Sequence, residues 1–324
     1  MIKIDLITGF LGSGKTTFLK KYAKYLLEQG QRICILENDF GAVNVDMLLL
    51  QDIMGENCEL EMVAGGCDAD CHKRRFKTKL ISMGMRGFDR VLIEPSGIFD
   101  VDEFFDSLHE EPLDRWYEIG NVIAIVDARL EPELSEESEY LLASQVAGAG
   151  QIVLSKSQEA SQEDVAGTAA RLNRVMEAFQ CPRRFTIEQD MIVKDWAELT
   201  EEDYKRLSGC GYVSENYRKL WFDQREAFHS VYYMHVRMTR EKLRETAEML
   251  LQDKACGTIF RIKGFMMEAE NRWIELNAVR GDISLQPIEK GQEVLIVIGE
   301  GLAKNAIDPY FVPYIVEEGT VCAE

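Results

Sequence analysis

The sequence predicts an α/β fold in which a mostly parallel β-sheet is flanked by helices, followed by a smaller C-terminal α+β domain. Through about residue 190, strand-like runs alternate with amphipathic helical runs, which is typical of a parallel sheet covered on both faces. From about Ser230, one strand and one helix are followed by several strands, which is α+β order. Because 324 residues exceed the roughly 150 expected per domain, we expect two compact units. We assign 1–200 to the sheet domain, 201–229 to a connecting segment and 230–324 to the second domain.

Each element of the first domain follows from the spacing of its apolar residues. Short apolar runs bounded by polar residues or glycine predict strands at 2–8, 32–37, 59–63, 90–94, 121–126 and 151–154. The clearest helix is predicted at 15–29, where apolar side chains recur at helical spacing and Gly30 provides a stop. Its apolar face consists of Phe18, Leu19, Tyr22, Ala23, Leu26 and Leu27. A strand, a helix and a second strand at the start of the chain predict a βαβ unit.

The second domain is predicted from the same signals. Strand-like runs cover 231–238, 258–265, 272–278 and 293–298, and a helix is expected at 239–252. The acidic and aromatic stretch that joins the two domains contains Tyr217, Leu220 and Trp221, so we expect it to be packed. The second domain carries no chemical motif of its own, and we interpret it as a client-binding or lid module.

Composition and charge argue against several classes of function. The formal net charge is −19 and the pI is about 4.8, so nucleic acid and anionic membranes are repelled at long range. No apolar run reaches the roughly 20 residues that span a bilayer, and the first residues lack the basic and apolar regions of a signal peptide. We therefore expect a cytoplasmic protein that binds neither nucleic acid nor membrane.

The strongest chemical signal is a phosphate-binding loop between the first strand and the first helix. Residues 9–16 read Gly-Phe-Leu-Gly-Ser-Gly-Lys-Thr and fit the pattern G-x-x-x-x-G-K-S/T. Glycines let backbone N–H groups point at a β-phosphate, and the positive end of the following helix adds to the attraction. We expect Lys15 to reach the β- and γ-phosphate oxygens and the Thr16 hydroxyl to bind Mg²⁺. The nucleotide-binding residues predicted from this loop are Gly9, Gly12, Ser13, Gly14, Lys15, Thr16 and Thr17.

Two further segments place carboxylates beside that loop. An apolar strand ends at Glu94, and Gly97 follows three residues later. An acid at this position can hold a Mg²⁺ shell or an attacking water, and a glycine N–H can contact a γ-phosphate. The second strand ends at Glu37 and leads into a loop that contains Asp46. We therefore predict a nucleoside triphosphatase with slow intrinsic turnover, in which Lys15, Glu37 and Glu94 are catalytic.

These three segments resemble the CobW-type GTPases, relatives of the urease and hydrogenase nickel-insertion GTPases. The resemblance covers nearly the whole chain, because that family also carries a small C-terminal α+β domain. It implies a GTP-dependent metallochaperone, with a metalloprotein or cofactor-assembly protein as client. It also implies that Glu37 and Asp46 belong to a first switch, and that Glu94 and Gly97 belong to a second. Asp46 and Glu94 would then join Thr16 around Mg²⁺.

The first departure from the family pattern concerns the base of the nucleotide. The stretch after the sixth strand reads Ser155-Lys156-Ser157-Gln158, where the family has Asn-Lys-x-Asp. Lys156 can still stack its stem on a base, but Gln158 has one acceptor and one donor group where a carboxylate accepts two bonds from guanine. Losing a bond to a charged partner removes roughly 1.5–3 kcal/mol, so guanine preference is expected to fall about ten- to a hundredfold. We predict relaxed base selectivity, or use of ATP; the alternative is that another residue restores guanine recognition.

The second departure concerns a transition-metal site. Residues 65–72 read Gly-Gly-Cys-Asp-Ala-Asp-Cys-His, where the family has Gly-Cys-x-Cys-Cys, so only Cys67 matches a family ligand. Thiolate and imidazole suit Zn²⁺ or another transition metal, which makes Cys67, Cys71 and His72 the candidate ligands. The alternative is two reduced thiols at the start of a helix, because C-x-x-x-C is a weak pattern. Most of the other cysteines are expected to be buried thiols.

A run of basic residues follows this segment, and the sequence does not decide whether it contacts solvent or a partner. Lys73, Arg74, Arg75, Lys77 and Lys79 form either a solvated helix face or a surface that meets an acidic client or the nucleotide of a nucleotide-dependent dimer. Three functions fit the sequence: an NTPase coupled to delivery of a metal or metal cofactor, a regulatory or assembly switch that handles no metal, and a small-molecule kinase. The kinase ranks last, because we find no acceptor-binding signature.

Overall fold

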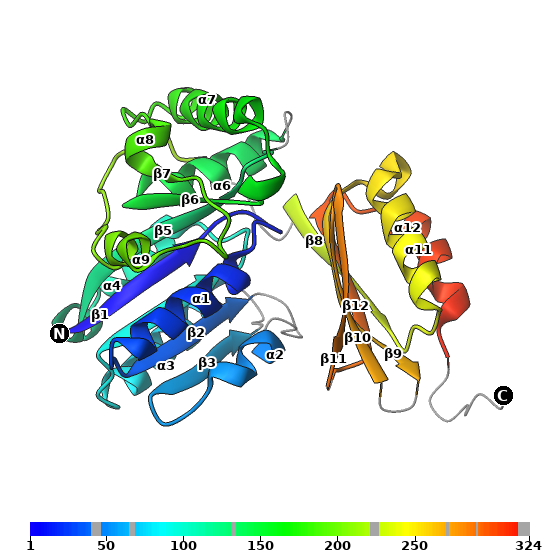
Figure 1. The fold of residues 1–324 in the computed structure, drawn as a ribbon, viewed down its shortest axis with the longest axis horizontal. Helices are drawn as coiled ribbons and strands as arrows, with labels where there is room; N and C mark the ends of the chain where they lie inside the picture. The colour runs from blue at the N-terminus through cyan, green and yellow to red at the C-terminus, as the bar shows by residue number, and fades with distance from the viewer. Residues whose placement is uncertain are drawn as a thin grey trace. The chain divides into compact units, whose positions relative to one another are not determined.

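The chain divides into two compact units, Met1–Trp221 and Phe222–Glu324, each of which is described by itself. The computed structural model describes residues 1–39, 47–64, 69–130, 134–220, 227–269, 272–289 and 291–316. The first unit is a parallel sheet flanked by helices, and the second is an antiparallel sheet with helices (Figure 1). The predicted fold class is therefore confirmed. Among the helices of these residues, none has both the length and the apolar character needed to cross a bilayer.

The first unit is built on one seven-stranded parallel sheet. Its strands are β1 (Ile2–Thr8), β2 (Ile33–Asp39), β3 (Cys58–Ala64), β4 (Arg90–Pro95), β5 (Tyr117–Asp127), β6 (Gln151–Ser155) and β7 (Met191–Ile192). They follow the order β3-β2-β4-β1-β5-β6-β7. Because the strands are parallel, their carboxyl ends meet along one edge of the sheet. The loops that follow β1, β4 and β6 therefore open on the same side.

Helices cover both faces of this sheet. They are α1 (Lys15–Glu28), α2 (Met47–Leu50), α3 (Ala69–Gly84), α4 (Val101–Leu108), α5 (Leu113–Trp116), α6 (Glu136–Ala147), α7 (Gln162–Ala178), α8 (Ile187–Asp190) and α9 (Glu201–Ser208). Figure 1 shows α1 and α9 on one face and α3 and α4 on the other. Helix α1 begins at the predicted residue and buries the predicted face, with Phe18, Leu19, Tyr22 and Leu26 fully enclosed.

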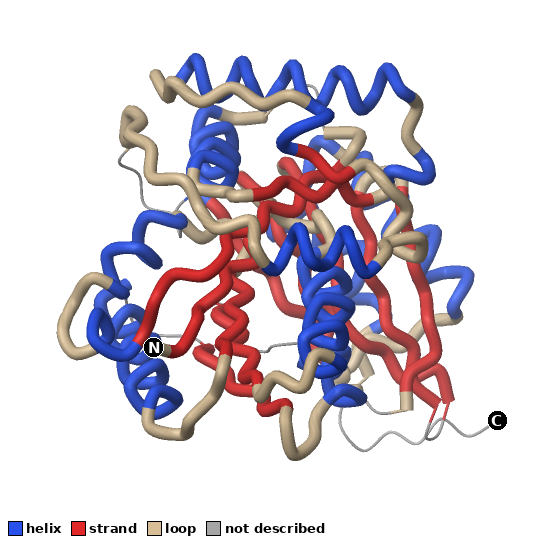
Figure 2. Tube along the Cα trace, turned by 60° about the vertical axis from the view of Figure 1, so that its left-hand side comes forward, coloured by secondary structure: helices blue, strands red, loops and turns tan. Residues whose placement is uncertain are grey.

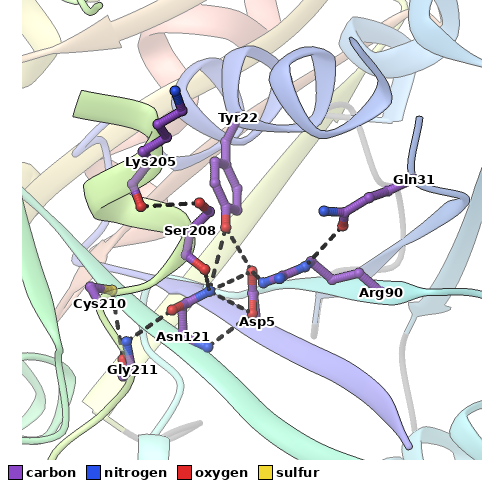
Figure 3. A network of polar contacts seen from close by, with 9 residues as sticks. All are labelled: Asp5, Tyr22, Gln31, Arg90, Asn121, Lys205, Ser208, Cys210 and Gly211. Atoms are coloured by element: carbon purple, nitrogen blue, oxygen red, sulfur yellow. Dashed lines mark hydrogen bonds and ion pairs between the residues drawn. The ribbon is translucent and has the colours of Figure 1, made fainter. Parts of the chain in front are cut away.

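A buried polar network ties the strands around β1 to α1 (Figure 3). Asp5 on β1 is fully buried; its Oδ2 lies 2.5 Å from Nη1 of Arg90 and 2.8 Å from the Tyr22 hydroxyl that donates to it. The Asn121 amide nitrogen donates to Oδ1 of Asp5 at 3.1 Å. Burial, followed by the Asp5 charge, raises the pKa of Tyr22 well above its ordinary value, so the phenol keeps its proton. Sequence reasoning did not single out this network; the signal that could have found it is the aspartate inside the apolar strand 2–8.

The second unit contains a five-stranded antiparallel sheet in the order β11-β10-β9-β12-β8. Its elements are β8 (Phe228–Met234), α11 (Arg240–Gln252), β9 (Thr258–Ala269), β10 (Arg272–Val279), β11 (Asp282–Ile288), β12 (Val294–Glu300) and α12 (Lys304–Phe311). The helices α11 and α12 lie on one face, and Figure 2 shows the strands in red beside the blue helices. Leu243, Leu250 and Phe311 fill the core between the helices and this sheet.

The structure differs from the sequence prediction at edge strands and at element ends. Sequence reasoning missed β11, an edge strand that contains Pro287 and, among the residues that the structure describes, pairs only with β10; it also missed the two-residue β7. Strand β5 begins at Tyr117, four residues before its predicted start, because its first residues pair with β1 although several are polar. Residues 201–208 of the predicted connection form α9, whose Leu207 is fully buried in the core of the first unit.

Candidate nucleotide-binding site

The loop between β1 and α1 has the backbone that a phosphate cradle requires. Gly9 has φ +146°, and a Cβ there would lie 2.3 Å from the Ile125 carbonyl oxygen, so only glycine fits against β5. Gly14 has φ +93° and is the N-cap residue of α1. Inside the loop, the Ser13 N–H donates to the Phe10 carbonyl at 3.2 Å. The loop therefore curls around the N-terminus of α1, where backbone N–H groups and the helix dipole favour an anion.

Lys15 is held inside this loop. Its ammonium donates to the carbonyl oxygens of Gly9 at 3.0 Å and Phe10 at 3.3 Å, and the residue is 7% exposed. Two carbonyl oxygens of the loop itself therefore hold the Lys15 ammonium at the loop. Phosphate oxygens that enter the loop would meet a charged donor there. Of the other predicted loop residues, Ser13 is buried and Thr17 is exposed.

Two carboxylates lie at the carboxyl ends of the strands next to the loop. The Thr16 hydroxyl donates to Oε1 of Glu94 at 2.7 Å. Glu37 on β2 stands directly opposite Glu94 in the parallel register of β2 and β4, and both glutamates are buried. Hydroxyl and carboxylate oxygens are hard donors of the kind that Mg²⁺ accepts, so Thr16 and Glu94 fit a Mg²⁺ ion bound with a nucleotide. Asp46, the other predicted Mg²⁺ ligand, lies outside the described residues.

The loop after β4 is fixed to both the phosphate loop and helix α6. A Cβ at Gly97 would lie 2.6 Å from the Leu11 backbone nitrogen, so this glycine is packed on the phosphate loop. The fully buried Gln145 on α6 donates from Nε2 to the Gly97 carbonyl at 2.9 Å. Earlier on the same helix, the Tyr140 hydroxyl donates to Oδ2 of Asp100 at 2.7 Å. Helix α6 thus holds both ends of the segment between Gly97 and α4.

The start of α4 is also joined to the segment that follows α9. Asp100 accepts a bond from the Asp102 N–H and so caps α4, and burial raises the pKa of the Asp100 carboxyl. The Tyr217 hydroxyl donates to Oδ2 of Asp102 at 2.7 Å, and Lys219 forms an ion pair with the same carboxylate. Sequence reasoning placed Tyr217 in a packed stretch but gave it no partner.

The predicted base-binding loop follows β6. Lys156 has φ +54°, and its ammonium lies 3.0 Å from Oδ2 of Asp127, which ends β5 directly opposite Ser155. Asp127 therefore orients the lysine that sequence reasoning expected to stack on a base, a role that the sequence did not reveal. Gln158 is exposed in the short 3₁₀ helix 157–159. The structure thus brings Asp127, Ser155 and Lys156 together at the same edge of the sheet as the phosphate loop.

The predicted transition-metal ligands are only partly within the described residues. Cys71 and His72 lie in the first turn of α3, where Cys71 is half-buried and His72 is buried, whereas Cys67 lies outside the described residues. Over the ranges given above, no group of three or more His, Cys, Asp or Glu side chains is placed to hold a metal ion. Burial raises the pKa of Cys34 to about 12 and of Cys58 to about 11, so these thiols stay protonated at neutral pH.

The basic run after Cys71 is partly neutralised within the first unit. Lys73 and Lys77 lie 3.3 and 2.9 Å from the two carboxylate oxygens of Glu110, and Lys79 lies 2.8 Å from Glu61. The two Glu110 contacts lower the pKa of its carboxyl. Arg74 is exposed on the same helix.

Models of known protein families match segments of both units. Residues 3–181 match the family model described as CobW/HypB/UreG, nucleotide-binding domain, and residues 228–311 match the cobalamin synthesis protein cobW C-terminal domain. The chain is 33% identical over 183 residues to the zinc chaperone YjiA of Escherichia coli (strain K12), covering 53% of this chain and 52% of that protein. It is 31% identical over 164 residues to the zinc chaperone YeiR of the same strain, covering 50% and 49%. The chain spans about half the length of the curated relatives it matches.

Solved structures give a weaker likeness. The Zn(II)-bound YjiA GTPase from E. coli is 22% identical with a TM-score of 0.37, and the match covers 97% of this chain and 99% of that one. The family assignment rests instead on the model of the nucleotide-binding domain, which matches more than half of the chain. The resemblance found from the phosphate loop and the segments around Glu37 and Glu94 is confirmed: the chain belongs to the CobW/HypB/UreG family.

Proposed function

We propose that this protein is a Mg²⁺-dependent P-loop nucleoside triphosphatase that couples slow hydrolysis of GTP, or of ATP, to delivery of a metal ion or metal cofactor. The observation that carries the proposal is the Thr16 hydroxyl bonded to the Glu94 carboxylate at 2.7 Å, beside the loop that encloses the Lys15 ammonium. Hard oxygen donors next to a phosphate cradle are what phosphoryl transfer requires. The names of the relatives YjiA and YeiR, both zinc chaperones, support Zn²⁺ as the cargo.

In this proposal, the oxygen of a water molecule bonds to the γ-phosphorus, the bond from that phosphorus to the bridging oxygen of the diphosphate breaks, and the water proton passes to the released phosphate. Lys15 turns its hydrogen bonds from the loop carbonyls to the β- and γ-phosphate oxygens and stabilises the charge that develops there. Mg²⁺ held by Thr16 and Glu94 would neutralise further charge on the same oxygens. Glu37, level with Glu94 on the neighbouring strand, positions the water. The Gly97 N–H contacts the γ-phosphate, so the loop after β4 responds when that group leaves.

The test of this proposal asks whether a bound metal ion changes the binding and hydrolysis of the nucleotide. Nucleotide affinity and turnover would be measured with and without stoichiometric Zn²⁺, Co²⁺ or Ni²⁺ on the wild type and on the Cys67→Ser/Cys71→Ser double variant. Cys210→Ser, at a half-buried thiol of the same unit, is the matched control. Metal delivery requires that the metal changes nucleotide affinity in the wild type and the control but not in the double variant, because coupling between two sites is reciprocal. If metal changes the turnover rate in none of the three proteins, the result would instead support a regulatory switch that handles no metal.

Base selectivity gives a separate prediction at Gln158. We expect the wild type to bind GTP and ATP with similar affinity, and Gln158→Asp to raise the preference for GTP about ten- to a hundredfold, because the carboxylate accepts two bonds from guanine. Competition between GTP and ATP for a fluorescent nucleotide measures the ratio. Gln162→Asp, at an exposed position in the first turn of α7, is the control. A strong GTP preference in the wild type would show that another residue has replaced the missing carboxylate.

A third prediction concerns Gln145, which the sequence did not single out. Gln145→Leu keeps the volume in the core but removes the donor to the Gly97 carbonyl. One net hydrogen bond contributes about 1 kcal/mol, so we expect single-turnover hydrolysis to slow about fivefold while nucleotide affinity changes less than twofold. Ser144→Ala is the control, because Ser144 is buried next to Gln145 on the same helix and its hydroxyl donates to the Leu141 carbonyl rather than to the loop after β4. Equal hydrolysis rates in Gln145→Leu and the control would contradict a role in the γ-phosphate response.

A further inference from the structure

A tryptophan outside every motif joins the base-binding loop to the phosphate loop. Trp196 follows β7, and its indole Nε1 donates to the carbonyl of Leu154 at 3.0 Å, one residue before Ser155. The six-membered part of the same ring lies against Gly14: a Cβ on that glycine would lie 3.1 Å from Cη2 and 3.4 Å from Cζ3. The ring also meets Phe18 on α1 edge to face at 5.6 Å between centroids. One side chain therefore contacts the end of β6, the last glycine of the phosphate loop and the helix that follows it.

Ser155, the first residue of the base-binding loop, also lies next to Gly14. Ser155 is buried, and its hydroxyl reaches the Val126 carbonyl on β5 at 3.5 Å. The Cβ of Ser155 is 3.9 Å from the position of a Cβ on Gly14, so the two loops are close neighbours. The Ser155 hydroxyl is turned to β5. The contact between the loops is made through the indole instead.

Trp196 is also placed unlike an ordinary core residue. It lies on a loop, it is only partly buried, and it packs at the margin of the core cluster around α1. Its N–H bonds a backbone carbonyl at the very end of a strand that carries the base-binding loop. A large rigid ring with a single directional donor fixes position at little cost in side-chain entropy.

We propose that Trp196 is a positioning residue that locks the base-binding loop 155–158 to Gly14 of the phosphate loop, and so sets the spacing between the base and the phosphates of a bound nucleotide. The inference rests on the proposed nucleotide function. It has a distinctive consequence, because a nucleoside triphosphate contacts both loops whereas inorganic tripolyphosphate contacts only the phosphate loop. Loss of the Trp196 contacts with the two loops therefore weakens binding of the nucleotide and leaves binding of tripolyphosphate unchanged.

The test uses the full chain and measures dissociation constants for Mg-GTP, Mg-ATP and Mg-tripolyphosphate by calorimetry. We expect Trp196→Ala to weaken both nucleotides about tenfold, through loss of one hydrogen bond and the ring contacts, and to change tripolyphosphate by less than about twofold. Trp196→Phe keeps an aromatic ring but removes the N–H donor and the outer ring atoms that lie against Gly14, so a loss smaller than that of Trp196→Ala is expected and the fold is retained. Trp116→Ala, on α5 of the same unit, is the control for loss of a large ring.

A second substitution separates positioning from simple stability. Ser155→Asn lengthens the side chain toward Gly14, so in the Trp196→Ala background it should restore at least part of the nucleotide affinity. Equal weakening of nucleotide and tripolyphosphate, or no recovery with Ser155→Asn, would overturn the proposal and leave Trp196 a structural residue. A wild type that binds tripolyphosphate but neither nucleotide would overturn the proposed function together with this inference. Unchanged nucleotide affinity in Trp196→Ala would overturn the inference alone.

Discussion

Replacing Lys15 with alanine is expected to lower kcat/KM for nucleotide hydrolysis by about 10²- to 10³-fold, the loss typical for one charged or polar donor aimed at a developing negative charge. The ammonium sits inside the loop between β1 and α1 and bonds the carbonyl oxygens of Gly9 and Phe10. Alanine keeps the helix start but removes the charge at the point where the γ-phosphate would lie. Phosphate release in the steady state and a dissociation constant for the nucleotide measure the two effects.

The matched control for this prediction is Lys21→Ala. Lys21 is on the same helix but lines a shallow depression with Tyr25 and Tyr204, outside the phosphate loop. The Lys21→Ala variant should hydrolyse the nucleotide as fast as the wild type. Wild-type turnover in Lys15→Ala would refute the assignment of the phosphate loop as the catalytic site, and equal losses in both variants would indicate a general effect of charge.

Replacing Arg90 with methionine is expected to lower the free energy of unfolding by about 3–5 kcal/mol. The Asp5 carboxylate is fully buried, and removal of the guanidinium 2.5 Å away leaves its charge with only the neutral donors Tyr22 and Asn121. Urea unfolding followed by circular dichroism measures the change. The double variant Asp5→Asn/Arg90→Met should recover part of the loss, because it removes the uncompensated charge as well.

An exposed ion pair provides the comparison. Arg115 on α5 and Glu111, four residues earlier in the preceding turn, form an ion pair with side chains 69% and 72% exposed. Arg115→Ala should change the free energy of unfolding by less than about 1 kcal/mol, because solvent screens such pairs. If Arg90→Met were as mild as Arg115→Ala, the network around Asp5 would contribute little to the stability of the sheet.

Local signals in the sequence were sufficient to predict the features that depend on residue type, residue order and backbone geometry. The phosphate loop and α1 were predicted because glycines, a lysine and a threonine follow a strand within a few residues and precede a regular apolar face. Glu37 and Glu94 were each predicted to lie beside the phosphate loop because each ends a strand, and the register of β2 and β4 places them opposite each other. These inferences need only residue type, order and the geometry of parallel sheets.

Contacts between distant residues could not be predicted in the same way. Gln145 and Gly97 are separated by 48 residues, Trp196 and Leu154 by 42, and Arg90 and Asp5 by 85. None of the three contacts has a signature at a fixed spacing, because the packing of one element on another decides which side chains meet. Edge strand β11 was missed for a related reason: with one partner and a proline, it lacks the apolar run that marks a central strand.

The bonds between the sheet and the segment after α9 decide where a separately expressed nucleotide-binding unit should end. Asn121 donates to the Ser208 carbonyl and accepts from the Gly211 N–H, and Tyr217 bonds Asp102 at the start of α4. A shortened chain that stopped at residue 200 would remove all three partners and uncover the core beneath α9. One that ran to residue 220 would keep them, and such a fragment is the shorter form suited to spectroscopy in solution.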